Sequence, residues 1–194
     1  MDALLTTPER VAIARLHALL ELLPAALDKR LGAAGVTAFE YTLLETLSEA
    51  ERTRMRLSAL AAKTNASLPR ISRVVTSLER RGLVSRAACE GDGRAINAVL
   101  TSDGAATHAL SRGLYAEAVR ELILTGLGSL PGDGVDQLAD LARAILTSLD
   151  TARAQGDGSG TTPTPEGPSG TRDCAADPAP ACPAAPTVPG SSAR

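Results

Sequence analysis

Apolar side chains recur with helical spacing over most of this chain and alternate with polar ones in only one short stretch. Near the start, steps of three and four residues separate five apolar positions: Ile13, Leu16, Leu20, Leu23 and Leu27. That spacing is typical of a helix that packs against another helix. Residues 7–9 predict the helix start, with Thr7 as its cap. Pro24 should kink or split the helix, and Gly32 and Gly35 should end it.

Two shorter helices are predicted next. Thr37 and Glu40 have the spacing of a capping box, so a helix should run from there to about residue 49. Its inward side chains should be Phe39, Leu43, Leu44 and Leu47. An extended piece at residues 55–57 then leads to a brief helix that Ser58 caps and that ends near Thr64.

A third helix and a β-hairpin follow the turn at Asn65 and Ala66. Ser67 should cap the helix, which runs through Arg81 and stops at Gly82. Residues 83–88 and 95–100 are predicted strands, and the turn-rich residues 89–94 join them into a hairpin.

Two further helices are predicted after the hairpin. Thr101 begins one that reaches about Thr125, and the other ends near Asp150. The last helix repeats the spacing of the first at five apolar positions: Val135, Leu138, Ala142, Ile145 and Leu149. We expect the first and last helices to pack together across a dimer axis, because a small central domain does not need these apolar faces. The alternative is that they cover their own core.

Composition sets the last segment apart. Residues 151–194 hold eight of the twelve prolines, and Gly, Ser, Thr and Ala make up most of the rest. Such a segment has too little apolar surface to offset its ordering entropy, so we expect a disordered tail.

Charge is distributed unevenly although the net charge is only −2. Residues 52–94 carry ten Lys and Arg against three Asp and Glu, a net +7, whereas residues 1–51 and 95–150 each carry a net −4. A basic middle between acidic flanks is expected where one face meets a polyanion, although a solvated basic surface would also produce it.

Several classes of protein are disfavoured. We see no signal peptide and no membrane span, and three cysteines without metal-ligand spacing favour an intracellular, reducing location. No nucleophile–base pair, paired carboxylates or glycine-rich phosphate loop is present, so we expect neither an enzyme, nor a cofactor, nor a metal site. His17 and His108 are expected to be surface or packing residues.

The helix expected from Ser67 to Arg81 is strongly two-sided. At 3.6 residues per turn its inward face collects Leu68, Ile71, Val75 and Leu78. The opposite face collects Pro69, Arg70, Arg73, Thr76, Ser77 and Arg80. Arginine can bridge guanine O6 and N7, and hydroxyls can serve phosphates or bases. The pattern therefore favours the second helix of a DNA-binding helix-turn-helix, although a solvated amphipathic helix shares it.

The hairpin tip adds a second candidate contact. Arg94 on a flexible tip can reach a narrow minor groove, where negative potential is concentrated, and Asp92 could hold an arginine in place. A polar turn with an incidental arginine is the alternative.

Four segments together resemble the MarR family of winged-helix regulators. They are Ala59–Ala62, the run ISRVVTSLERRGLV from Ile71 to Val84, Asp92-Gly-Arg94, and Leu100-Thr-Ser-Asp-Gly104. The resemblance covers about residues 7–150. It implies a mainly α fold with a β-hairpin wing, in which Ser72, Arg73, Thr76 and Ser77 match major-groove positions and Asp92 and Arg94 match the wing.

The resemblance also implies the organisation and partners of the chain. Residues 1–35 would form an N-terminal dimerisation helix, 36–101 the winged helix-turn-helix domain and 102–150 the C-terminal dimerisation helices, with 151–194 as the tail. A cytoplasmic homodimer would bind a palindromic operator in double-stranded DNA. A small phenolic or anionic effector would release it, so the protein would act as a repressor.

Two hypotheses stay open beside this one. The winged helix could serve protein–protein contact, with the proline-rich tail as the docking element. Cys89, at the wing, could be redox-active, although the peroxide-sensing members carry their cysteine in the first helix, where this chain has none.

Overall fold

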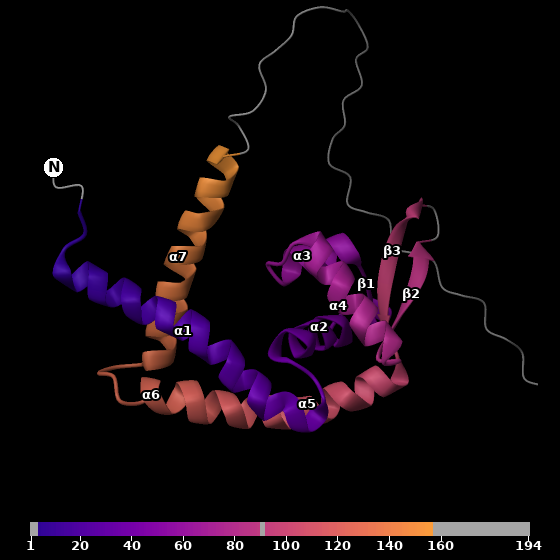
Figure 1. The fold of residues 1–194 in the computed structure, drawn as a ribbon, viewed down its shortest axis with the longest axis horizontal. Helices are drawn as coiled ribbons and strands as arrows, with labels where there is room; N and C mark the ends of the chain where they lie inside the picture. Colours follow the sequence, from indigo (N-terminus) through magenta and orange to yellow (C-terminus); the bar gives the residue numbers. More distant parts are fainter. Residues whose placement is uncertain (1–3, 90–91, 157–194) are drawn as a thin grey trace, which may run out of the picture. The chain divides into compact units, whose positions relative to one another are not determined.

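The computed structural model describes residues 4–89 and 92–156. The chain forms two compact units, Met1–Ala139 and Asp140–Arg194. Figure 1 shows the element order. The helices are α1 (Thr7–Leu31), α2 (Ala38–Ser48), α3 (Leu57–Lys63), α4 (Leu68–Arg80), α5 (Ser102–Val119), α6 (Thr125–Leu127) and α7 (Gly134–Gly156). The strands are β1 (Arg54–Arg56), β2 (Val84–Cys89) and β3 (Asp92–Leu100). The expected mainly α fold with a small β wing is confirmed.

The cap of helix α1 lies one residue earlier than expected, and the helix itself begins at Thr7. Its N-cap is Thr6, whose amide and hydroxyl both donate to the Glu9 carboxylate at 2.6 and 2.8 Å. These bonds hold the pKa of Glu9 below its usual value. Pro24 lies inside the helix and does not split it. After Leu31 a 3₁₀ turn, Gly32–Ala34, ends at Gly35, whose φ of 70° suits glycine.

The core of the first unit lies between α2, α3, α4 and the sheet, which together we call the central lobe. The expected capping box of α2 is present, since Thr37 Oγ1 accepts from the Glu40 amide and Glu40 accepts from the Thr37 amide. Phe39 is only partly buried, and Tyr41, which the inward pattern omitted, is buried. The buried cluster is Leu31, Val36, Tyr41, Leu43, Leu44, Leu47, Leu57, Leu60, Ala61, Ile71, Val75, Leu78, Leu83, Val84, Ala98 and Leu100.

The three strands form an antiparallel sheet in the order β1-β3-β2. The expected hairpin is confirmed, with Ser85 opposite Val99 and Ala87 opposite Asn97. Each strand extends further toward the tip than expected, to Cys89 and back to Asp92, with a bulge after Ala88. The extended piece before α3 is the third strand of this sheet, because β1 pairs with the base of β3 from Arg54 to Arg56.

Helices α3 and α4 form the helix-turn-helix. Ser58 is not the cap of α3, because the helix starts at Leu57 with Arg56 in the cap position. The chain reverses through Asn65, which has a φ of 51°. Helix α4 ends as expected before Gly82, whose φ of 72° only glycine adopts easily.

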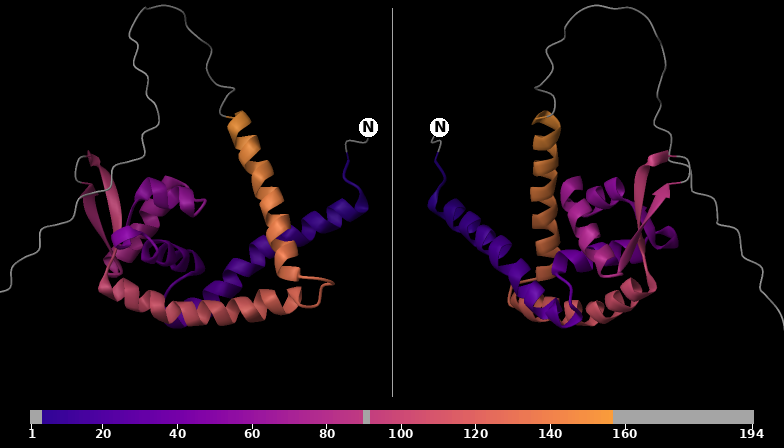
Figure 2. Two further views of the ribbon diagram at one scale, coloured as in Figure 1. Left: turned by 180° about the vertical axis from the view of Figure 1, so that it is seen from behind. Right: turned by 45° about the vertical axis from the view of Figure 1, so that its right-hand side comes forward.

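Helix α5 returns from the sheet and packs against α1 and α2, as the two views of Figure 2 show. Its cap is Thr101, whose hydroxyl accepts from the Gly104 amide at 3.0 Å and donates to the Gly82 carbonyl at 2.7 Å. A π turn, Arg120–Leu124, links α5 to α6. Arg30 of α1 forms an ion pair with Glu121 in this turn.

Helix α7 extends to Gly156, six residues past the expected end. Residues 151–155 are Thr, Ala, Arg, Ala and Gln, and four of these five are good helix formers, whereas the prolines of this segment begin only at Pro163. The remainder of the expected tail, residues 157–194, lies outside the described residues. No described helix combines the length and apolar character needed to cross a membrane.

Candidate nucleic-acid interface

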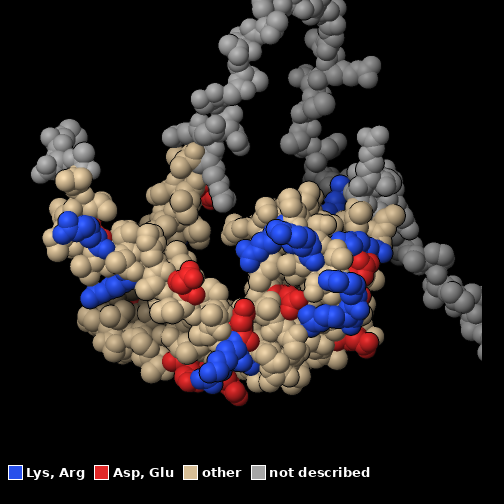
Figure 3. All heavy atoms as spheres, viewed as in Figure 1, with Lys and Arg blue, Asp and Glu red and all other residues tan. Residues whose placement is uncertain are grey.

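The outward face of α4 carries the residues that the sequence assigned to DNA. Five of them are exposed: Ser67, Pro69, Arg70, Arg73 and Arg80. The other three, Ser72, Thr76 and Ser77, are partly buried. On the face drawn in Figure 3, Lys and Arg gather over the central lobe. Within the described residues, no hydrogen bond or ion pair engages the Arg73 side chain, so its guanidinium is available to a ligand.

Burial of the apolar face of α4 explains why the opposite face is oriented outward. Ile71, Val75 and Leu78 are fully buried, which fixes the rotation of the helix about its axis. Leu68 was expected on the same face but is 50 % exposed. It is the first residue of α4, one turn before the helix reaches the core, and a helical wheel does not register where a core begins.

The N-terminus of α4 differs from expectation in its cap. Ser67 occupies the cap position, but its hydroxyl makes no capping hydrogen bond. The hydroxyl is therefore not used by the helix. Pro69 stands in the first turn, where its missing amide costs nothing.

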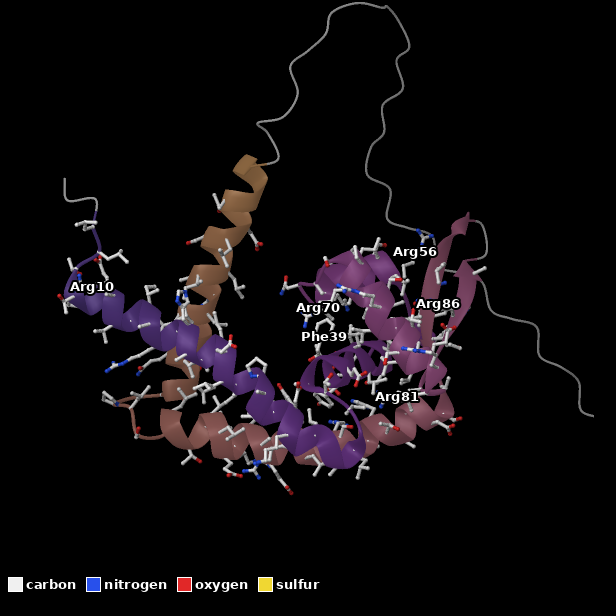
Figure 4. All side chains as sticks on the ribbon, viewed as in Figure 1. Arg10, Phe39, Arg56, Arg70, Arg81 and Arg86 are labelled. Atoms are coloured by element: carbon white, nitrogen blue, oxygen red, sulfur yellow. The ribbon has the colours of Figure 1, made fainter. Side chains whose placement is uncertain are left out.

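Arg70 is tied to the neighbouring helix. Its guanidinium carbon lies 3.9 Å from the ring centroid of Phe39 in α2, and Figure 4 shows the two side chains together. A cation over an aromatic face is attracted by the ring quadrupole. The stacking restricts the Arg70 side chain, whereas the Arg73 side chain, about one turn later, has no such partner among the described residues.

Two arginines that sequence reasoning missed fasten α4 to its surroundings, and Figure 4 labels both. Arg81, just after α4, donates to Glu40 Oε1 at 3.0 Å and to the Gly35 carbonyl at 2.5 Å. The same Glu40 closes the capping box of α2. One carboxylate therefore joins the start of α2 to the end of α4.

The second missed residue is Arg86 of β2. Its Nη1 donates to Glu79 Oε2 at 2.8 Å, and its Nη2 donates to the Ser72 carbonyl at 3.1 Å and to Thr76 Oγ1 at 2.9 Å. A sequence signal for it existed. Side chains two apart in a strand share a face, so Arg86 lies on the same face as the buried Val84 and needs polar partners there.

The wing residues can be placed only in part. The backbone of Asp92 and Arg94 belongs to β3. Their side chains, and that of Cys89, lie outside the described residues, so the expected minor-groove contact and the redox hypothesis stay predictions.

A polar and aromatic cluster joins α2 to α5 behind the interface. The Tyr41 ring stacks on Tyr115 at 4.4 Å and on His108 at 5.8 Å, and His108 pairs with Glu45. Burial raises the pKa of Tyr41 to about 12, and the charge and hydrogen bond of Glu45 add to the effect. His108 is thus a buried packing residue, whereas His17 is exposed. Across the described residues, no three His, Cys, Asp or Glu side chains gather as metal ligands.

Comparison with known proteins identifies the family to which this chain belongs. Residues 36–96 match the MarR family model. The structure is similar to that of AbsC, a MarR family transcriptional regulator from Streptomyces coelicolor, with 32 % sequence identity and a TM-score of 0.70. The match covers 77 % of this chain and 99 % of AbsC. This chain belongs to the MarR family.

Two further MarR structures contain DNA. Sco3205 from Streptomyces coelicolor, in complex with DNA, is 28 % identical, with a TM-score of 0.71 over 76 % of this chain and 92 % of that one. A mutant MarR from E. coli, complexed with operator DNA, shares the fold at 24 % identity, with a TM-score of 0.61 over 71 % and 96 % of the two chains. No curated protein matches the sequence.

The structure also gives physical reasons for the MarR-like motif at Leu100–Gly104. Thr101 is the α5 cap, and its bond to the Gly82 carbonyl fastens α5 to the turn after α4. Gly104 is buried because α5 passes the backbone of Leu83 at close range. The motif is therefore a junction between the central lobe and α5.

Proposed function

We propose that this MarR-family protein is a sequence-specific transcriptional regulator that binds double-stranded DNA through the central lobe. The exposed face of α4 carries the proposal, because it presents guanidinium and hydroxyl groups on a helix whose opposite face is buried at Ile71, Val75 and Leu78. That display suits the major groove. The contact set is Ser67, Pro69, Arg70, Ser72, Arg73, Thr76, Ser77 and Arg80, with Asp92 and Arg94 of the wing in the minor groove.

The contacts divide by how each side chain is held. Arg73, exposed and unengaged among the described residues, is the candidate for base recognition. Arg70, stacked on Phe39, is better suited to a phosphate, which accepts a cation from many directions. Ser67, with a hydroxyl unused by its helix, is a second candidate for phosphate.

The decisive experiment measures binding to DNA from the upstream region of the protein's own gene, with scrambled DNA beside it, at two salt concentrations. Specific binding should weaken steeply with salt because phosphate contacts release counterions. Arg73→Ala and Arg94→Ala should each cost roughly 1–3 kcal/mol of specific binding.

Arg112→Ala is the matched control, because it removes the same charge from the exposed surface of α5. It should leave specific binding unchanged. Equal loss from all three variants would show a general charge effect, and no binding to any DNA would reject the proposal in favour of a protein–protein module.

We propose that the active form is a homodimer assembled through α1 and α7. Both helices expose large apolar side chains, at Val11, Ile13, Leu19, Leu20 and Leu22 and at Val135, Leu138, Leu141, Ile145, Leu146 and Leu149. Monomeric proteins rarely expose so many together. A dimer would place two α4 helices on a palindrome, with half-sites about 34 Å apart.

The dimer is tested on α7 with one substitution on each side of the helix. Ile145→Glu should yield a monomer by light scattering and abolish specific DNA binding. Thr147→Glu, about 200° around the helix, adds the same charge and should leave the dimer intact. A dimer that survives Ile145→Glu would contradict this role of α7.

The finer proposal is that the protein represses and that a small phenolic or anionic ligand releases it from DNA. The family resemblance supports it, and we place the proposed ligand response at the aromatic stack of Tyr41, Tyr115 and His108, which connects α2 of the central lobe to α5. A titration of the protein–DNA complex with salicylate, a phenolic anion, should release the DNA. Loss of that response in Tyr41→Ala, with DNA binding retained, would support this location.

A further inference from the structure

Arg86 fastens the base of the wing to the second helix of the helix-turn-helix. It stands on β2 opposite Ala98 of β3, and its side chain is 25 % exposed. Figure 4 shows it between α4 and the hairpin. Both Nη atoms donate to α4.

The three acceptors of Arg86 lie along one side of α4. Ser72, Thr76 and Glu79 are separated by four and three residues, so they succeed one another on one face of the helix over about two turns. A single planar guanidinium therefore restrains both the tilt and the axial position of α4 relative to β2, which one ion pair could not do.

Thr76 takes part in this restraint through its hydroxyl. It donates to the Ser72 carbonyl at 2.8 Å and accepts from Arg86 Nη2 at 2.9 Å. The hydroxyl proton is already used, so the Thr76 hydroxyl serves the internal network rather than a DNA acceptor. Its methyl group remains for apolar contact.

The orientation of the Arg86 guanidinium toward α4 leaves one of its own donors without a hydrogen bond. Arg86 Nε is buried and has no hydrogen-bond partner among the described residues, and an unmade bond to a buried donor is unfavourable. Glu79 neutralises the Arg86 charge at 2.8 Å. A partly buried guanidinium that is already paired with a carboxylate is poorly placed to attract a phosphate.

We propose that Arg86 is a positioning residue that sets the angle between α4 and the wing. It thereby lets the major-groove and minor-groove contacts be made at one site without itself touching DNA. The inference rests on the proposed DNA-binding function. It separates Arg86 from Arg70, Arg73 and Arg80 on the exposed face of α4, which would act on the polyanion directly.

Arg86→Met, which keeps the length of the side chain, is the first test. Specific binding should fall roughly tenfold, within the range for one lost base contact. The dependence of affinity on salt should keep its slope, whereas a lost phosphate contact would lower the slope by about 0.9. Arg80→Met, an exposed residue of the same helix, should lower the slope.

The second readout is coupling to the wing. If Arg86 positions the wing, Arg94→Ala should cost much less in the Arg86→Met protein than in the unaltered protein. Additive losses, a reduced salt slope or unchanged affinity would each overturn the inference. Thermal unfolding is measured alongside, and Glu79→Gln, which removes the cation's partner without touching the contact set, carries the same comparison if Arg86→Met does not fold.

The two proposals fail in different ways. Absence of specific binding by the unaltered protein rejects the function and the inference together. Specific binding that is sensitive to Arg73→Ala but not to Arg86→Met rejects the inference alone.

Discussion

Gly104 lies at the closest approach between α5 and the central lobe. A Cβ atom there would lie 2.0 Å from the Leu83 carbonyl oxygen and 2.8 Å from Leu100 Cδ1. The Leu83 carbonyl cannot turn away freely, because it accepts from the Thr101 amide at 3.2 Å. Gly104→Ala must therefore displace backbone rather than a flexible side chain.

The size of the effect follows from this contact. Non-bonded heavy atoms normally stay about 3.5 Å apart, so the first turn of α5 would have to move by more than about 1 Å. Overpacking typically costs 1–3 kcal/mol, and a clash with backbone belongs at the upper end of about 3 kcal/mol. For a chain of this size that loss lowers Tm by roughly 6–12 °C.

Gly113→Ala is the matched control within the same helix. Gly113 is exposed and nothing lies within 4 Å of its Cβ position. Alanine should stabilise α5 there by roughly 0.5–1 kcal/mol. Thermal unfolding at one fixed protein concentration should shift Tm in opposite directions for the two variants. A Gly104→Ala protein as stable as the unaltered one would refute the steric reasoning.

Two other predictions concern groups that the sequence did not single out. Arg81→Met should lower the free energy of unfolding, measured in urea, by about 1–2 kcal/mol, because it leaves the Glu40 carboxylate, 12 % exposed, without its cation. Arg80→Met should change that free energy little. Equal losses from the two variants would contradict a stabilising role for the Arg81–Glu40 pair. In Tyr115→Phe, which leaves Tyr41 as the one tyrosine, tyrosinate absorbance should rise near pH 12. The unfolded phenol ionises near 10, so unfolding should become easier as pH rises from about 10 to 12; a midpoint near 10 in the folded protein would refute burial as the cause.

Structural features that are determined by residues close in the sequence were predicted well. The capping box of α2 and the stop at Gly82 depend on bonds and dihedral angles within a few residues, so the local sequence was sufficient. The buried face of α4 followed from the helical period. The cap of α1 was misplaced by one residue because Thr6 and Thr7 offer the same hydroxyl and only the folded chain distinguishes them.

Features that depend on distant residues were not predicted. Arg81 finds Glu40 across 41 positions of sequence, and nothing in the pattern selects that carboxylate. The pairing of β1 with β3 also joins segments more than 40 residues apart. The exposure of Leu68 depends on where the core begins in space. Side-chain positions at the wing tip remain predictions.

The sheet gives the hairpin a mechanical character. β1 supports β3 only from Val99 to Asn97, and beyond that point β2 and β3 continue as a two-stranded ribbon. The five residue-to-residue steps from Asn97 back to Asp92 span about 17 Å. If a ribbon of that length tilts by about 5° where β1 stops supporting it, its tip moves by about 1.5 Å. That displacement exceeds the range of distances that a hydrogen bond tolerates. The rigidity of the three-stranded base of the sheet therefore limits how accurately the tip of the hairpin can be positioned.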